Sequence, residues 1–177
     1  MYVNSGGGTA ANMSEFDVYS FRLGAFSTTP SAPNTPAPTL VVSLDGGHEA
    51  DSHGTMLTKQ GRYLWVADRI GNRIVVIKTA TGRMVGEFPL AGTLSEDPSP
   101  DLLDISPTGD LAFVPLRGAL PLSGDPHAST GSTPGLGIIL VRKDGRTGVL
   151  RGIARVANVD ADGIDRADPH GLRVRLK

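Results

Sequence analysis

Two stretches of the sequence decide the fold: "HGTMLTKQGRYLWVADR" at residues 53–69 and "DLLDISPTGDLAFVPLR" at residues 101–117. They align without a gap at a constant offset of 48 residues. The matched positions are chemically alike, since Trp65 falls on Phe113. Self-similarity at a fixed period of this size is typical of repeat proteins. The chain therefore contains an internal repeat.

Each repeat predicts four short strands. A first strand ends at the turn "KQG" or "PTG", and a second strand follows in "RYLWVAD" or "DLAFVPL". Two more strands lie in "GNRIVVIKTATGRMVGEFPL" and in "GLGIILVRKDGRTGVLRGIARV". Four strands in about 40–50 residues, separated by Gly-containing turns, predict one blade of a β-propeller. We expect Leu57, Trp65 and Val75 to pack between neighbouring sheets.

The chain is therefore predicted to be all-β, a β-propeller domain or fragment with about three four-stranded antiparallel blades. Blade one covers residues 1–45 and lacks its first strand, blade two covers 51–92, and blade three covers 100–159. A lone first strand is expected at 168–177. Propellers usually close with about four to eight blades, so the ring is expected to be incomplete. We expect the remaining blades to belong to a longer chain, and a homo-oligomer that completes the ring is the alternative.

The composition narrows the function classes. Lys plus Arg number 17 against 18 Asp plus Glu, so the net charge is −1 and no basic segment suits a nucleic acid or an anionic membrane. The absence of cysteine excludes disulfides and thiolate chemistry. The longest apolar runs, such as "LGIILV", are too short to span a membrane, and the opening "MYVNSGGGTA" does not have the pattern of a signal peptide. We therefore expect no nucleic-acid partner and no membrane span.

Three motifs carry a family resemblance: "YVNS" at residues 2–5, "LWVADRIGNRIVVIKTATGRMV" at 64–85 and "SPTGDLAFV" at 106–114. With these motifs the chain resembles the YVTN family of β-propeller repeat proteins, which is related to the lactonase-like seven-bladed propellers. The resemblance implies the propeller fold over nearly the whole chain, and a periplasmic or secreted location. The chain departs from the family at Lys78, where an acidic residue is common, and in a long loop of blade three.

The tripeptide Asp-x-His occurs three times, at Asp51 and His53, at Asp125 and His127, and at Asp168 and His170. In a propeller blade, the connection entering the first strand and the connection between the second and third strands open on the same face. All three copies are therefore expected on one face, the two entry copies beside the channel mouth. Asp101 has the repeat position of His53, and Arg69 and Arg117 are matched in the next connection on that face.

These residues suit more than one chemistry. Imidazoles beside carboxylates can bind a divalent metal ion, with His53, His127 and His170 as the metal ligands. An aspartate can instead hold a histidine as a general base, and Arg69 and Arg117 can add anion recognition. A purely structural alternative also remains, because Asp and His at a strand entry often cap a turn by hydrogen-bonding backbone amides.

The sequence leaves two functions open. The first is a non-catalytic binding or scaffold module that engages a small-molecule ligand or a protein partner through this face. The second, which follows the resemblance, is a lactonase-like hydrolase that uses the Asp-x-His cluster at the channel mouth. The fold itself hosts many functions and decides neither.

Overall fold

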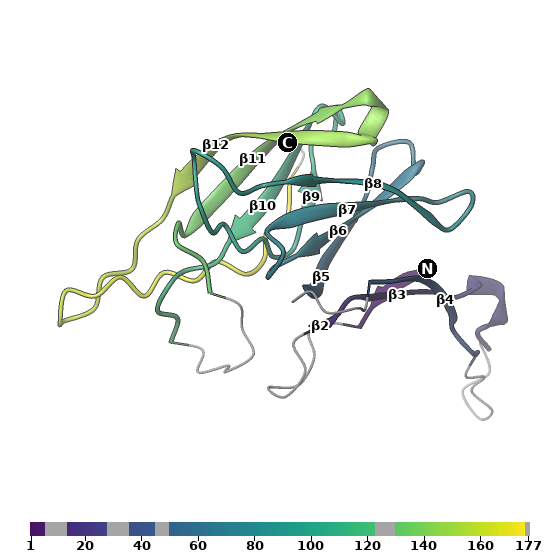
Figure 1. Ribbon diagram of the computed structural model, residues 1–177, viewed down its shortest axis with the longest axis horizontal. Helices are drawn as coiled ribbons and strands as arrows, with labels where there is room; N and C mark the ends of the chain where they lie inside the picture. Colours follow the sequence, from purple (N-terminus) through teal and green to yellow (C-terminus); the bar gives the residue numbers. More distant parts are fainter. Residues whose placement is uncertain (6–13, 28–35, 45–49, 123–129, 176–177) are drawn as a thin grey trace.

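The computed structural model describes residues 1–5, 14–27, 36–44, 50–122 and 130–175 (Figure 1). This part of the chain contains twelve strands and two single-turn 3-10 helices. The strands are β1 (Tyr2–Asn4), β2 (Ser14–Glu15), β3 (Asp17–Ser20), β4 (Thr39–Ser43), β5 (Ala50–Leu57), β6 (Tyr63–Asp68), β7 (Arg73–Lys78), β8 (Arg83–Pro89), β9 (Asp104–Ile105), β10 (Leu111–Leu116), β11 (Gly135–Arg142) and β12 (Thr147–Arg155). The short helices are η1 (Leu23–Ala25) and η2 (Lys143–Gly145).

The strands form three sheets, with strand orders β1-β3-β4, β2-β5-β6-β7-β8 and β9-β10-β11-β12 (Figure 1). Neighbouring strands are antiparallel, except that the two residues of β2 pair in parallel with β5. The predicted all-β architecture of incomplete propeller blades is therefore confirmed. In the described part of the chain, no helix is long and apolar enough to cross a membrane.

Blade two, formed by β5 to β8, is apolar on both faces, and a neighbouring sheet packs on each of them. Side chains alternate along its central strands, so neighbours in sequence enter different cores. The core toward blade one contains Phe16, Val18, Val42, Leu64, Val66, Val75 and Ile77. The core toward blade three contains Trp65, Ile74, Val76, Phe88, Ala112, Val114, Leu116 and Ile139. Packing of blade two on both sides therefore holds the three sheets together.

Trp65 is the largest side chain of the core toward blade three and is completely buried. Its indole Nε1–H donates a 2.7 Å hydrogen bond to the carbonyl of Gly145, and its ring meets Phe88 edge-on with centroids 4.9 Å apart. Gly148 allows this approach, because a Cβ there would lie 2.9 Å from both rings. One indole of blade two is thus bonded to the turn between the third and fourth strands of blade three.

Leu57 does not pack between sheets as predicted. Its side chain is 48% exposed, whereas Trp65 and Val75 are fully buried as expected. On β5 the preceding Met56 enters the core toward blade three, so Leu57 faces blade one. The described strands of blade one include no inner strand there, and the space is a cavity of about 450 Å³ lined in part by Tyr2, Leu57 and Leu64.

The predicted lone strand at the C-terminus is also different. Residues 168–175 form no strand, and they run beside the start of blade three. The amide of Leu102 donates to the carbonyl of His170 (3.2 Å), and the amide of Val174 donates to the Asp104 carboxylate (2.8 Å). A first strand needs the second strand of its own blade as a partner, and no such strand follows among the described residues.

The two-sided packing predicts unequal costs for two apolar truncations. Trp65→Ala should lower the free energy of unfolding by about 3–5 kcal/mol, because it empties the core and leaves the Gly145 carbonyl without its donor. Leu57→Ala should cost less than about 1 kcal/mol, because the side chain is half exposed. Urea denaturation of both variants measures the difference, and equal losses would contradict this packing.

Candidate functional site

The predicted site residues that the structure describes gather at one end of blades two and three. They form a continuous series of charged contacts, here called the charged cluster: Asp51, His53, Arg69, Asp101, Arg117, Asp168 and His170. Asp125 and His127 lie outside the described residues. The convergence follows from strand direction, because β5 begins, and β6 and β10 end, at the same edge of the antiparallel sheets.

Asp101 lies at the centre of the charged cluster, and its side chain is completely buried. Its Oδ1 is 2.9 Å from Nε2 of His53, and its Oδ2 is 3.1 Å from Nδ1 of His170. These are ion-pair distances without hydrogen-bond geometry, so both oxygens lack a hydrogen-bond partner among the described residues. A carboxylate removed from water in this way is costly for the folded state.

The two repeat-matched arginines pair differently. Nε of Arg69 donates to the Asp51 carboxylate of its own blade. Arg117 donates through Nε (2.5 Å) and Nη2 (2.9 Å) to both oxygens of Asp168, which follows blade three. The repeat explains the difference. Arg117 pairs with an aspartate that follows its own blade, and the equivalent position after the blade of Arg69 is Ser99, which has no carboxylate. Each guanidinium therefore has an aspartate partner of its own.

Both guanidiniums also approach Asp101 without binding it closely. Nη1 of Arg117 is 3.5 Å from Oδ2 of Asp101, and it is itself buried without a hydrogen-bond partner in the part of the chain that the structure describes. Nη1 of Arg69 is 3.9 Å from the same oxygen. The side chains of Arg69 and Arg117 are only 7% and 0% exposed, so the predicted role in anion recognition does not match their placement.

The two histidines are the parts of the charged cluster that reach solvent. The side chain of His53 is 29% exposed and that of His170 is 47% exposed. Both ring nitrogens of His170 face carboxylates, since its Nε2 is 3.0 Å from Asp168. His53 faces a carboxylate through Nε2 alone among the described residues.

Close backbone packing makes this arrangement possible. A Cβ on Gly54 would lie 2.3 Å from the carbonyl oxygen of Asp101, so only glycine lets β5 approach the start of blade three. At Gly171, which also follows a histidine, an added Cβ would meet only Leu102 at an ordinary 3.5 Å. The glycine after His53 is therefore a requirement of the site, and the one after His170 is not.

The sequence analysis did not single out Asp68, which binds the backbone of Asp51 in the charged cluster. Its carboxylate is completely buried and accepts the backbone amides of Asp51 and Gly71, both at 2.9 Å. It also pairs with Nε of Arg73 at 2.9 Å. The sequence did indicate this residue in one way. Asp68 is an acidic residue at the end of the apolar strand β6, and the equivalent position of the next repeat is Leu116.

The predicted metal site needs three ligands, and one of them, His127, lies outside the described residues. Among the residues that the structure describes, no three His, Asp or Glu side chains are arranged to hold a metal ion. His53 and His170 instead face the same carboxylate from two sides.

No protein-family model matches the sequence, and no curated protein matches it. Among solved structures, a protein from Lactobacillus plantarum is similar over 90% of this chain and 40% of its own, with a TM-score of 0.55 and 17% identity. Two proteins described as "putative 6-phosphogluconolactonase", from Bacteroides fragilis and Bacteroides uniformis, give TM-scores of 0.44 and 0.38 at 12% and 18% identity. They are covered over 49% and 60% of their lengths, against 91% and 87% of this chain. The first of these likenesses supports the fold alone.

Asp168 predicts a specific dependence of stability on pH. Burial raises the pKa of its carboxyl, but the hydrogen bonds and charge of Arg117 outweigh burial and hold that pKa below its usual value. Because the pKa is lower in the folded chain, the stabilisation is present above the unfolded pKa, near 3.8, and is lost as the pH falls through the folded value.

The free energy of unfolding of the wild type should fall as the pH is lowered from about 5 to 3, and we expect this fall to be smaller in Asp168→Asn. Urea denaturation at each pH measures this loss. Asp162→Asn, a change at an exposed loop carboxylate, is the matched control and should retain the wild-type slope. An unchanged slope in Asp168→Asn would show that the pair with Arg117 does not stabilise the chain.

Proposed function

We propose that the chain is a binding module of a β-propeller, and that it holds a small molecule at the channel mouth between His53 and His170. The observation that carries the proposal is the buried Asp101 carboxylate, which has no hydrogen-bond partner among the described residues and lies 2.9 Å and 3.1 Å from two imidazoles that reach solvent. A buried carboxylate is costly for folding, and such a group beside side chains that reach solvent is typical of a functional site.

If these side chains instead capped turns, their carboxylates would accept hydrogen bonds from backbone amides. Caps satisfy backbone amides, yet within the described residues the carboxylates of Asp51 and Asp101 accept no backbone hydrogen bond. Asp168 accepts one, a long 3.4 Å bond from the amide of Gly118. The side chains of the charged cluster are thus engaged mainly with one another, which favours a site over a set of turn caps.

The charge of the cluster indicates the kind of ligand. Three aspartates face two arginines, and each arginine already has a carboxylate partner, so a negative charge remains at Asp101. The exposed groups above it are two imidazoles. A neutral or cationic ligand rich in hydroxyl or amine donors suits this surface better than an anion does.

A hydrolase of a small ester or lactone is the second candidate, favoured by the orientation of His53. Its Nε2 lies 2.9 Å from the Asp101 carboxylate and no described residue pairs with its Nδ1, an arrangement from which a general base could work. Hydrolysis of glucono-1,5-lactone separates the candidates. Under the binding proposal the rate equals that of buffer, and a faster rate that disappears in His53→Ala would favour the hydrolase.

Removal of both imidazoles tests the binding proposal. We expect a screen of polyols and amines, followed by NMR of the histidine ring signals, to find ligands that shift both His53 and His170. The double variant His53→Ala, His170→Ala should abolish this binding, while the melting temperature should change by less than about 4 °C because both rings are partly exposed.

The matched control is Arg151→Ala, at an exposed position of β12, which should bind as the wild type does. A double variant that loses several kcal/mol of unfolding free energy, in a chain for which no ligand shifts either histidine, would contradict the proposal. That result would assign the histidines to stabilisation of the strand entries.

A further inference from the structure

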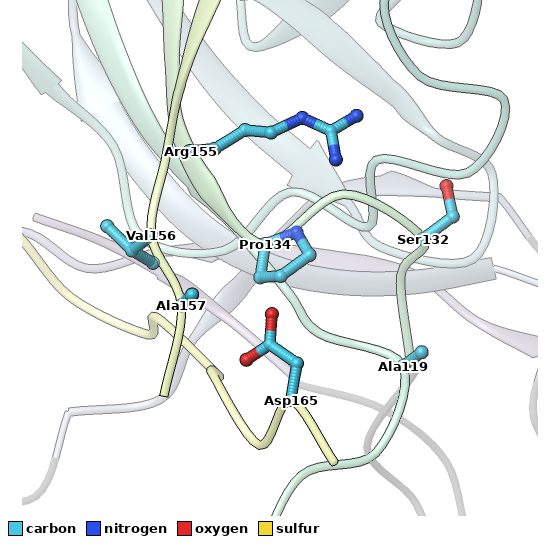
Figure 2. A pocket seen from close by; sticks show the side chains of 7 residues that line it. All are labelled: Ala119, Ser132, Pro134, Arg155, Val156, Ala157 and Asp165. Atoms are coloured by element: carbon cyan, nitrogen blue, oxygen red, sulfur yellow. The ribbon is translucent and has the colours of Figure 1, made fainter. Parts of the chain in front are cut away.

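One cavity lies outside the charged cluster. It has a volume of about 370 Å³ and lies between the end of β12, the segment after it and the connection from β10 to β11 (Figure 2). The residues that line it are Ala119, Ser132, Pro134, Arg155, Val156, Ala157 and Asp165. None of them belongs to the charged cluster, and the volume is within the range of small-molecule sites.

Arg155 supplies a positive charge at this cavity. Its backbone is fixed, because β12 pairs it with Gly135 of β11 and the next amide, of Val156, donates to the carbonyl of Pro134 (3.2 Å). Its guanidinium forms no ion pair or hydrogen bond with any residue that the structure describes, and it extends along the cavity toward Ser132 (Figure 2). A guanidinium on a fixed strand end can therefore bind an external carboxylate with two parallel hydrogen bonds.

Asp165 supplies a fixed negative charge across the cavity. Its Oδ1 accepts the amides of Asn158 and Ala167, both at 2.9 Å, which leaves Oδ2 without a partner in the described part of the chain. These two backbone hydrogen bonds also lower the pKa of the carboxyl, so it is ionised at neutral pH. In Figure 2 the carboxylate points toward Pro134 from the side opposite Arg155.

The two charges do not pair with each other, although both border one cavity. The walls between them are small and largely apolar, being formed by Pro134, Val156 and Ala157. We propose that this cavity binds a free α-amino acid, with the ligand carboxylate on Arg155, the ligand ammonium on Asp165 and the side chain against the apolar walls. The complementary charges at opposite sides supply the orientation, and the walls supply the apolar contact.

Isothermal titration calorimetry with L-leucine and with L-alanine tests the ligand class. At least one of them should bind, and its N-acetyl and amide derivatives should each bind roughly tenfold more weakly or worse, because each removes one charge-assisted contact. An absence of binding by both amino acids would overturn the proposal. Equal binding of the free amino acid and its amide would overturn it as well.

Two conservative variants test the residues. Arg155→Gln and Asp165→Asn should each weaken binding roughly tenfold or more, and Asn keeps an oxygen that can accept the two backbone amides, so the loop should stay in place. Arg151→Gln and Asp162→Asn are the controls, since both positions are exposed and lie outside the cavity. Unchanged binding in the first two variants would refute the assignment.

The proposal does not depend on the charged cluster. The double variant His53→Ala, His170→Ala should bind the amino acid as the wild type does, whatever becomes of binding at the channel mouth. Loss of amino-acid binding in that variant would place the ligand in the charged cluster instead, and would contradict the assignment to Arg155 and Asp165.

Discussion

The burial of the Asp101 carboxylate is the constraint on which the site depends. Three separate segments meet at this side chain: β5 through His53, the connection after β10 through Arg117, and the C-terminal segment through His170. The close approach of β5 requires Gly54, and the bidentate pair of Arg117 with Asp168 fixes the C-terminal segment. The surrounding positive charge offsets part of the desolvation cost, but no donor in the described part of the chain forms a hydrogen bond with the carboxylate.

The position of the site follows from the packing of blade two. Because both faces of β6 and β7 are apolar and covered, the register of the three sheets is fixed, and equivalent strand ends are brought to one face. The repeat then places Arg69 and Arg117 in equivalent connections. The repeat is imperfect at Ser99 and Asp101, and that imperfection leaves one carboxylate without a dedicated partner.

The sequence predicts the fold well because the repeat and the strand pattern are local properties. Trp65 and Val75 are buried as expected, whereas the exposure of Leu57 depends on a neighbour that the described part of blade one does not provide. For the site, the shared face of His53 and His170 follows from strand direction, but the turning of both arginines toward aspartates depends on side-chain geometry. Asp68 and Arg155 belong to no sequence motif, so their roles follow only from the contacts of Asp68 and from the position of Arg155 at the cavity.

The central claim is that Asp101 is retained for a ligand rather than for stability, and the unfolding free energy of Asp101→Asn tests it most directly. Since Arg69 and Arg117 keep their own aspartates, we expect the variant to stay within about 1 kcal/mol of the wild type, or to be more stable, while it loses the ligand-induced shifts of His53 and His170. A loss of about 3–5 kcal/mol would instead show that Asp101 is the structural partner of the surrounding cations, and would contradict the account.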